Sequence, residues 1–400
     1  MNDGVSANIL TIKNKPLRHV DNRTDQEITS SLLNPSPVTT EKNVWAFWDG
    51  GFTSMPPWCQ RNALGWVRLL GPSWTVRVLD LVPGSPANIL GFLDAENLPD
   101  HVGKVKTGGA KAGPNLSDTL RLPCIYQHGG VWLDLGITLF MDLDDVCWKA
   151  ISSPASRYEV AVASGDPSLE SGVAENFFVA ARKGNGLVYR WMIILREAWK
   201  GKTSNKGIHA HPLFTHLIEG GNITSVFAGA SGDRLDYFQA YLAWERLRLL
   251  EDPNDGFSGP KYCKNRVLLL EYQEFASAAM LTDNHGPTQF DYFVTSTKPP
   301  PASDEAAMKK YQEAKEFCEH LLGKCAMMKL YRWRDGGEPT LAELWDDKDK
   351  RNGSDADNRP GTFGEQMRYI SSHYTQDRRI VPLKFPAIKE KVLVAGVLEY

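Results

Sequence analysis

Residues 117–140 read SDTLRLPCIYQHGGVWLDLGITLF, and this stretch decides the fold. Its first eleven residues have a helical pattern, the glycine pair at 129–130 ends the helix, and the rest is a β-branched and aromatic run typical of a strand. Successive side chains of a strand point to opposite faces, so Asp134 shares one face with Trp132 and Gly136. The opposite face is entirely apolar and belongs against a core. The stretch therefore predicts a rigid strand that presents one carboxylate between an aromatic ring and a glycine gap.

The helix that precedes this strand carries a second polar group. Asp118 and Arg121 are three residues apart and therefore share one helix face, from which they could hold one ligand together. In isolation such a pair is more often a surface ion pair, worth roughly 0.2–0.5 kcal/mol. Pro123 removes an amide donor from the same helix and predicts a kink or a delayed start.

The residues upstream predict a strand, a helix and a second strand. Residues 43–48, NVWAFW, form a β-prone run that Asp49 and two glycines stop. Residues 57–70 repeat apolar positions at helical spacing before Gly71 and Pro72, and TVRVLDL at 75–81 alternates as a strand does. A strand, a helix and a strand in this order are the unit that builds parallel sheets.

The alternation continues downstream. We expect strands at residues 158–165 and 176–182 and helices at 187–199 and 304–324. Residues 346–361 form a charged excursion, and the last strand pattern lies within 389–400.

Composition limits the class of protein. The chain has 400 residues, of which 42% are hydrophobic and 23% charged, so it folds around a substantial core. A formal net charge of −3 provides no basic field for nucleic acid, and no partner of that kind is expected. The six cysteines lack a metal-site or disulfide spacing. The sequence also lacks a signal pattern and an apolar run of membrane-spanning length, so we expect no membrane span and a cytoplasmic protein.

The order Ser-Asp-x-x-Arg, helix, Gly-Gly-x-aromatic-x-Asp resembles that of glycosyltransferases with an Asp-x-Asp sugar-binding region. The matching residues are Ser117, Asp118, Arg121, Gly129, Gly130, Trp132 and Asp134. Within that group the sequence is most similar to the capsular-polysaccharide-synthesis family, whose version runs Gly-Gly-Val-Trp-Leu-Asp and which opens with a short Trp-rich strand. The likeness covers roughly residues 43–200 and includes ENFFVAARKGN at 175–185. Further on, AMMKLYRWR at 326–334 resembles a Lys-Leu element found late in such enzymes.

This resemblance implies a GT-A-like, Rossmann-like α/β fold, with a mixed, mostly parallel central sheet flanked by helices and with helical additions at the C-terminus. The nucleotide would sit at the carboxyl ends of the strands. A polar run rich in Asn, Thr and Ser predicts a flexible N-terminal arm at 1–42. We expect a nucleotide-sugar-binding catalytic domain at 43–300 and a helical and irregular extension at 301–400 that packs on the core.

The resemblance also implies roles for individual residues. Trp45 or Trp48 would stack on the nucleobase, and Trp132 would line the ribose or base. Asp118 and Arg121 would hold sugar hydroxyls or phosphate, and Asp134 would touch the ribose and a divalent metal, Mn²⁺ or Mg²⁺. The remaining expected donor-site residues are Ser117, Gly130 and Asn176. Asn176 could instead cap a turn.

The sequence departs from the fuller motif at Gly136, which replaces the second carboxylate. Three interpretations follow. Asp142, Asp144 or a histidine of residues 209–216, HAHPLFTH, could complete the shell of an ion, since Mg²⁺ often needs only one or two protein carboxylates. Alternatively, Arg121 and lysines could neutralise the phosphates without a metal. The pocket could also bind another ligand or catalyse a reaction other than glycosyl transfer.

The leading hypothesis is a glycosyltransferase that moves a sugar from a nucleoside-diphosphate donor to a hydroxyl acceptor, either a polysaccharide or a small metabolite. Relatives with the fuller motif often retain the anomeric configuration, so retention is expected by analogy. The alternative is a repurposed GT-A-like enzyme or a non-catalytic binding protein for a non-sugar small molecule. A scaffold role in a biosynthetic assembly is a third hypothesis. The oligomeric state, the donor and the acceptor stay open.

Overall fold

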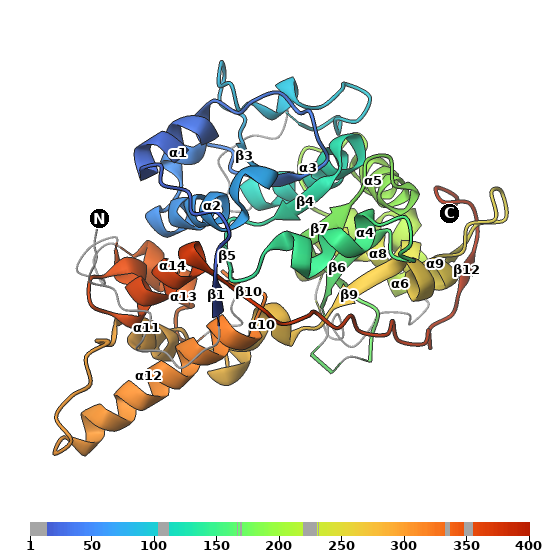
Figure 1. The fold of residues 1–400 in the computed structure, drawn as a ribbon. Helices are drawn as coiled ribbons and strands as arrows, with labels where there is room; N and C mark the ends of the chain where they lie inside the picture. The colour runs from blue at the N-terminus through green and yellow to red at the C-terminus, as the bar shows by residue number, and fades with distance from the viewer. Residues whose placement is uncertain are drawn as a thin grey trace.

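A mixed six-stranded sheet forms the centre of the protein (Figure 1). The computed structural model describes residues 14–102, 112–165, 167–168, 170–218, 230, 232–332, 337–347 and 355–400. The strands, in spatial order, are β3 (Thr75–Leu79), β2 (Asn43–Phe47), β4 (Gly130–Leu133), β7 (Ala174–Ala181), β6 (Val160–Ser164) and β9 (Val267–Leu270). Strand β7 runs antiparallel to both of its neighbours, while every other pair is parallel. The sheet is therefore mixed and mostly parallel, as the sequence predicts.

Both faces of the sheet are buried, which explains why its strands are so uniformly apolar. On β2, Val44 and Ala46 point into one hydrophobic core, while Trp45 and Phe47 point into another. Strand β4 repeats this division with Val131 on one side and Trp132 on the other. Alternate side chains of these strands thus belong to two separate cores, one on each face of the sheet.

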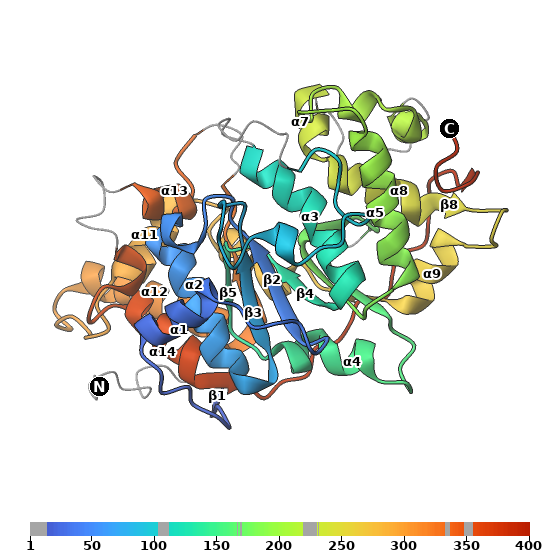
Figure 2. The same ribbon diagram turned by 90° about the horizontal axis from the view of Figure 1, so that it is seen from above.

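The first core lies between the sheet and one layer of helices (Figure 2). This layer consists of α3 (Ala112–His128), α5 (Gly186–Trp199) and α8 (Gln239–Leu249), with the shorter α6 (Thr215–Ile218), α7 (Gly232–Tyr237) and α9 (Gly259–Arg266) beside them.

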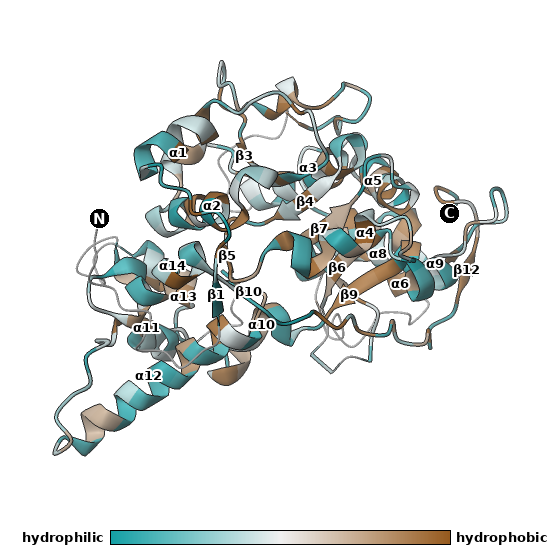
Figure 3. Cartoon of the chain, viewed as in Figure 1, coloured by the Kyte–Doolittle hydropathy of each residue, from teal (hydrophilic) through white to brown (hydrophobic). Residues whose placement is uncertain are grey.

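The second core lies on the opposite face of the sheet and includes buried residues of the helices between residues 273 and 373, in the C-terminal part of the chain. Its helices are α1 (Asp25–Leu33), α2 (Pro57–Leu70), α4 (Lys149–Ser152), α10 (Gln273–Leu281), α11 (Gly286–Val294), α12 (Glu305–Lys324), α13 (Leu341–Asp346) and α14 (Phe363–His373). The strands of the sheet are coloured as largely hydrophobic and α12 as largely hydrophilic, since α12 lies at the edge of the molecule (Figure 3). Leu321 of α12 nevertheless shares this core with Trp66 of α2, and so do Trp345 of α13 and Met367 of α14.

Most of the expected elements are confirmed, including the strand, helix and strand of residues 43–81. The helix expected from residue 117 begins five residues earlier and runs through Pro123. An interior proline costs roughly 3 kcal/mol, but α3 buries Leu116, Leu120 and Ile125 against the sheet, which outweighs that cost.

The single strand expected at residues 131–140 is wrong, because the chain turns after β4. The amide of Ile137 donates to the carbonyl of Asp134 (3.1 Å) and closes the turn. Strand β5 (Ile137–Leu139) then leaves the central sheet and pairs antiparallel with β10 (Met327–Lys329). Asp134 therefore lies in a turn at the carboxyl end of β4 instead of in a strand.

The N-terminal part also differs from the loose arm that the sequence predicts, although residues 1–13 lie outside the described part. Strand β1 (Asn14–Pro16) pairs with β11 (Tyr374–Gln376). Helix α1 has a capping box at Thr24 and buries Ile28 and Leu32 in the second core. The last expected strand shrinks to β12 (Leu393–Val394), which pairs with β8 (Leu250–Glu251).

Three further expectations concern the surface and the cysteines. Of the charged excursion at 346–361, residues 348–354 lie outside the described part. All six cysteines are free thiols and buried. Within the described ranges, no helix combines the length and the apolar character that crossing a bilayer requires.

Gly130 permits the close contact between β4 and β2, and its replacement tests that contact. Its φ is +110°, and a Cβ there would lie 2.3 Å from the carbonyl oxygen of Asn43. We expect Gly130→Ala to lower the free energy of unfolding by about 3 kcal/mol, from strain and overpacking together. Gly184 has a φ of +74° but open space around it, so Gly184→Ala should cost only about 1–2 kcal/mol. Equal losses in urea denaturation would refute the steric explanation.

Candidate functional site

A cavity of about 650 Å³ opens where β2 and β4 end. Its lining comes from the segment after β2, from α2, α3, α7 and α8, from the turn after β4, from the start of β7 and from the end of β10 with the segment after it. Seven residues predicted from the sequence contribute to the lining: Trp48, Ser117, Asp118, Arg121, Trp132, Asp134 and Asn176.

Two carboxylates and a guanidinium meet in this cavity. The Nη2 atom of Arg121 lies 2.5 Å from Oδ1 of Asp118 and 3.6 Å from Oδ1 of Asp134. Helix α3 delivers the first two groups one turn apart, and the turn after β4 delivers the third. The three side chains to which the resemblance assigns roles in donor binding therefore meet in one cavity.

Arg121 lies beneath the carboxylates. Its side chain is 3% exposed, against 12% for Asp118 and 26% for Asp134. Its other N–H groups also serve the protein, since Nη1 donates to the carbonyl of Asn176 and Nε to the carbonyl of Ser117 (3.3 Å). The geometry suits a residue that positions the two acids, whereas the sequence predicts a residue that grips the donor.

Each carboxylate has its own neutral donor as well. The side-chain amide of Asn176, on β7, donates to Oδ1 of Asp118 (3.1 Å). The indole N–H of Trp132 donates to Oδ1 of Asp134 (3.1 Å), and the guanidinium of Arg121 lies 5.5 Å from the centre of that ring. Asn176 therefore orients one acid instead of capping a turn, and Trp132 orients the other from its place in the hydrophobic core.

Lys329, from the end of β10, pairs with the other oxygen of Asp134. Its Nζ atom lies 2.9 Å from Oδ2 of Asp134, and its side chain is 11% exposed. Burial opposes ionisation of Asp134, but attraction to Lys329 and Arg121 outweighs burial and lowers the pKa of this carboxyl. Burial dominates at Asp118 and raises its pKa to about 6 despite the nearby Arg121.

The two candidate base-stacking tryptophans occupy different places. Trp45 is fully buried under α3, donates its indole N–H to the carbonyl of Gly129 (2.8 Å) and stacks on His128. It is absent from the cavity lining. Trp48 follows β2, lines the cavity and is partly exposed, with its indole N–H bonded to Oγ of Ser54 (3.0 Å). Of the two rings, Trp48 is the one that a ligand in the cavity can reach.

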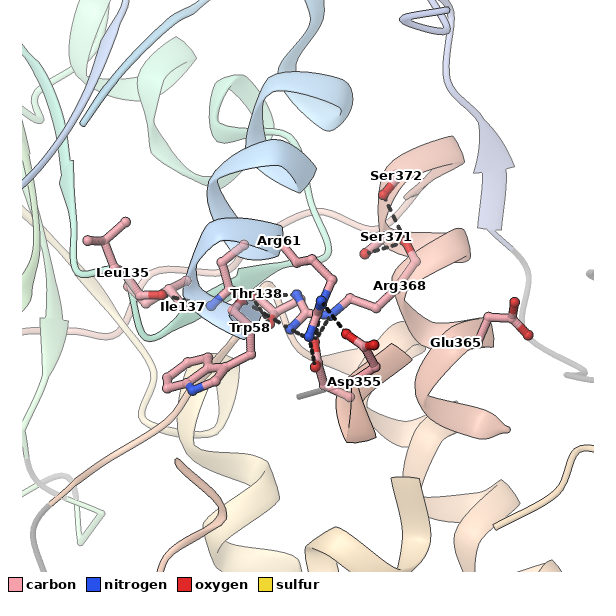
Figure 4. A network of polar contacts seen from close by, with 12 residues as sticks. Trp58, Arg61, Leu135, Ile137, Thr138, Asp355, Glu365, Arg368, Ser371 and Ser372 are labelled. Carbon is pink, nitrogen blue, oxygen red and sulfur yellow. Dashed lines mark hydrogen bonds and ion pairs between the residues drawn. The ribbon is translucent and has the colours of Figure 1, made fainter. Parts of the chain in front are cut away.

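A buried polar network holds the turn that carries Asp134 (Figure 4). The side-chain amide of Asn62, on α2, donates to the carbonyl of Leu135 (2.7 Å), and its oxygen accepts from the hydroxyl of Thr138 (2.9 Å). Arg368 of α14 donates to the same oxygen and to Asp357 (2.8 Å). The turn is thus anchored from behind by two helices.

The sequence did not predict several cavity residues, most of which come from segments far from the motif, whereas Glu175 directly precedes the predicted Asn176. They are Glu175, Tyr237, Tyr241, Lys329, Tyr331 and Arg332. Glu175 accepts a hydrogen bond from the hydroxyl of Tyr241 (2.5 Å), and burial raises its pKa. The Lys-Leu element within residues 326–334 is the one signal that could have drawn attention to Lys329, Tyr331 and Arg332. Residues 333–334 of that stretch lie outside the described part.

The groups considered as further metal ligands lie elsewhere. Asp144 pairs with Lys42 (2.7 Å), and Asp142 accepts from the amide of Asp144 (2.8 Å). His209 pairs with Asp236 (2.5 Å), and His211 caps the short helix that follows it. None of these side chains lines the cavity. Gly130 lies outside the lining too and serves the packing of β4 on β2.

Comparison with known proteins gives a consistent result. The sequence profile of the family described as Capsular polysaccharide synthesis protein matches residues 9–220. The O-glycosyltransferase braB of Annulohypoxylon truncatum is 39% identical, covering 96% of this chain and 92% of the relative. The glycosyltransferase afumC of Aspergillus fumigatus is 38% identical (94% and 96% covered), and the O-glycosyltransferase PaGT of Phomopsis amygdali is 32% identical (96% and 95%). The chain therefore belongs to the capsular polysaccharide synthesis protein family and is a glycosyltransferase enzyme.

Proposed function

We propose that this enzyme transfers a sugar from a nucleoside-diphosphate-sugar donor to a hydroxyl group of an acceptor, in the cavity at the ends of β2 and β4. The observation that carries the proposal is the meeting of Asp118, Asp134 and Trp48 in one cavity, in a chain whose relatives are glycosyltransferases. An aromatic ring can bind a base, and fixed carboxylates can accept hydrogen bonds from sugar hydroxyls.

The place of the cavity supports a nucleotide ligand and a GT-A-like reading of the fold. In open α/β sheets, ligands bind outside the carboxyl ends of the strands. Trp48 follows the carboxyl end of β2, and Asp134 follows that of the parallel strand β4. Both side chains therefore face the region where a nucleotide is expected.

We assign each residue to the part of the donor that its position in the cavity allows it to contact. Trp48 binds the base at the cavity wall, and Asp134, oriented by Trp132, binds the ribose end of the donor. Asp118, held by Asn176, accepts hydrogen bonds from the sugar. Arg121 and Asn176 both donate to Oδ1 of Asp118, and we propose that Oδ2 accepts from the sugar hydroxyls.

The proposed reaction forms a bond between the acceptor oxygen and the anomeric carbon. The bond from that carbon to the β-phosphate oxygen breaks, its electron pair stays on the nucleoside diphosphate, and the departing diphosphate takes the hydroxyl proton. We propose that the anomeric configuration is retained, which proton NMR of the product reads directly. The names of braB and PaGT specify O-glycosylation, which supports an oxygen acceptor here, on a polysaccharide or a small metabolite.

A donor screen tests this function. Incubation with UDP-glucose, GDP-mannose and similar donors should release a nucleoside diphosphate, and Asp134→Asn should lower kcat/KM about 10²-fold because Lys329 loses its charged partner. Asp255→Asn is the control, since Asp255 forms an exposed ion pair with Arg190 and should change kcat/KM little. If no donor binds or turns over, with or without Mn²⁺, the proposed function is wrong and a non-sugar ligand becomes the better hypothesis.

The pKa of Asp118 gives a prediction for the pH profile. With that pKa raised to about 6, the carboxylate is ionised at pH 7 and becomes protonated as the pH falls. We expect kcat/KM to decline below pH 6, approaching tenfold per unit, because the protonated acid accepts hydrogen bonds poorly. Asp118→Asn should lower kcat/KM at pH 7 and remove this acid limb. An unchanged acid limb in Asp118→Asn would assign it to another group.

A further inference from the structure

We propose that the ammonium group of Lys329 occupies the place of the divalent cation in the donor site, so that this enzyme binds and cleaves its nucleotide sugar without a metal. The inference rests on the proposed function and deepens it. Its basis is the relation between three positions, namely the carboxylate at 134, the glycine at 136 and the lysine at 329.

The ammonium lies between Asp134 and the place of the missing carboxylate. A Cβ built at Gly136 would lie 3.7 Å from Nζ of Lys329, and Nζ itself lies 2.9 Å from Oδ2 of Asp134. An ion shared by acids at 134 and 136 would have to sit in the same space. The glycine at 136 and the lysine at 329 therefore belong together, because the ammonium takes the space beside Asp134 that an ion bound by two acids would need.

The backbone fixes this arrangement. In the β5–β10 pair, Lys329 lies opposite Ile137, and the amide of Leu330 donates to the carbonyl of Gly136 (2.9 Å). A Cβ at position 136 would approach the carbonyl of Leu330 to 3.0 Å, so the glycine also lets the two chains come this close. Lys329 thus enters the cavity from a strand that is hydrogen-bonded to the motif.

The residues present do not fit a bound metal ion. Both oxygens of Asp134 are engaged, Oδ2 by Lys329 and Oδ1 by Trp132, with Arg121 nearby at 3.6 Å. Across the part of the chain that the structure describes, no three His, Cys, Asp or Glu side chains gather in a way that could hold an ion. A divalent ion beside Asp134 would also meet two positive side chains.

The ammonium can supply the charge that the reaction needs. Of its three N–H donors, one serves Asp134, and the group faces the rings of Phe177 (5.1 Å) and Tyr331 (5.7 Å). The remaining donors are available to diphosphate oxygens in the cavity. As the bond to the anomeric carbon breaks, negative charge grows on the β-phosphate oxygen beside a fixed positive charge, and the lysine keeps its proton.

A second cation follows on the same segment. Arg332 lines the cavity, is 44% exposed and lies 5.2 Å from the ring of Trp58, where Asp346 pairs with it. One ammonium carries half the charge of a divalent ion, and a guanidinium three residues further along can contribute to the field on the phosphates. Lys329 and Arg332 therefore form the positive wall of the donor site.

Nucleotide binding by the 400-residue chain, with and without metal, tests the inference. Calorimetric titration with UDP and with GDP should give, for the nucleotide that binds, a Kd that changes less than twofold between EDTA and Mn²⁺. Lys329→Met should weaken that binding at least tenfold, and Mn²⁺ should not restore it. The control is Lys315→Met, because Lys315 is also partly buried and paired, with Glu319 (3.5 Å), but lies on α12 away from the cavity.

The outcomes separate this inference from the function on which it rests. Binding that EDTA abolishes and Mn²⁺ restores would overturn the role of Lys329 and leave the transferase proposal intact. Lys329→Met with wild-type affinity would do the same. If neither nucleotide binds under any metal condition, the proposal that this cavity is a nucleotide-sugar donor site is wrong. The wild-type comparison needs no variant, so it decides the question even if Lys329→Met fails to fold.

Discussion

The site depends on the balance of charge around Asp134. A carboxylate taken out of water is costly unless cations and hydrogen bonds compensate it. Here Lys329 and Arg121 lie on its two sides, and the indole of Trp132 donates to it. Because Lys329 lies on β10, the charge compensation of Asp134 links β10 to the end of β4 in the central sheet.

The compensation also determines which groups remain for a ligand. The N–H groups of Arg121 bind two acids and two backbone carbonyls of the protein, while the carboxylates line the cavity. The two other cations that line the cavity, Lys329 and Arg332, come from a different wall. Acids on the sheet side and cations on the β10 side are a suitable arrangement for a ligand with hydroxyls at one end and phosphates at the other. The network of Asn62 and Arg368 keeps this arrangement in place by fixing the intervening turn.

Local patterns were enough to predict much of this. The opening strand, helix and strand, the helix with Asp118 and Arg121, and the meeting of that pair with Asp134 all follow from periodicity and from one motif. The break after β4 could not be predicted in the same way, because it depends on the pairing of β5 with β10, nearly two hundred residues away. The pairing of Lys329 with Asp134 and the burial of Trp45 are long-range effects of the same kind. The roles assigned to individual cavity residues stay predictions.

A crystal structure of the protein soaked with both Mn²⁺ and the nucleoside diphosphate that it binds would test the central claim most directly. The account predicts Nζ of Lys329 within hydrogen-bonding distance of a diphosphate oxygen and of Asp134, with no anomalous peak for manganese between them. A manganese peak on Asp134, with the lysine displaced from the cavity, would contradict it.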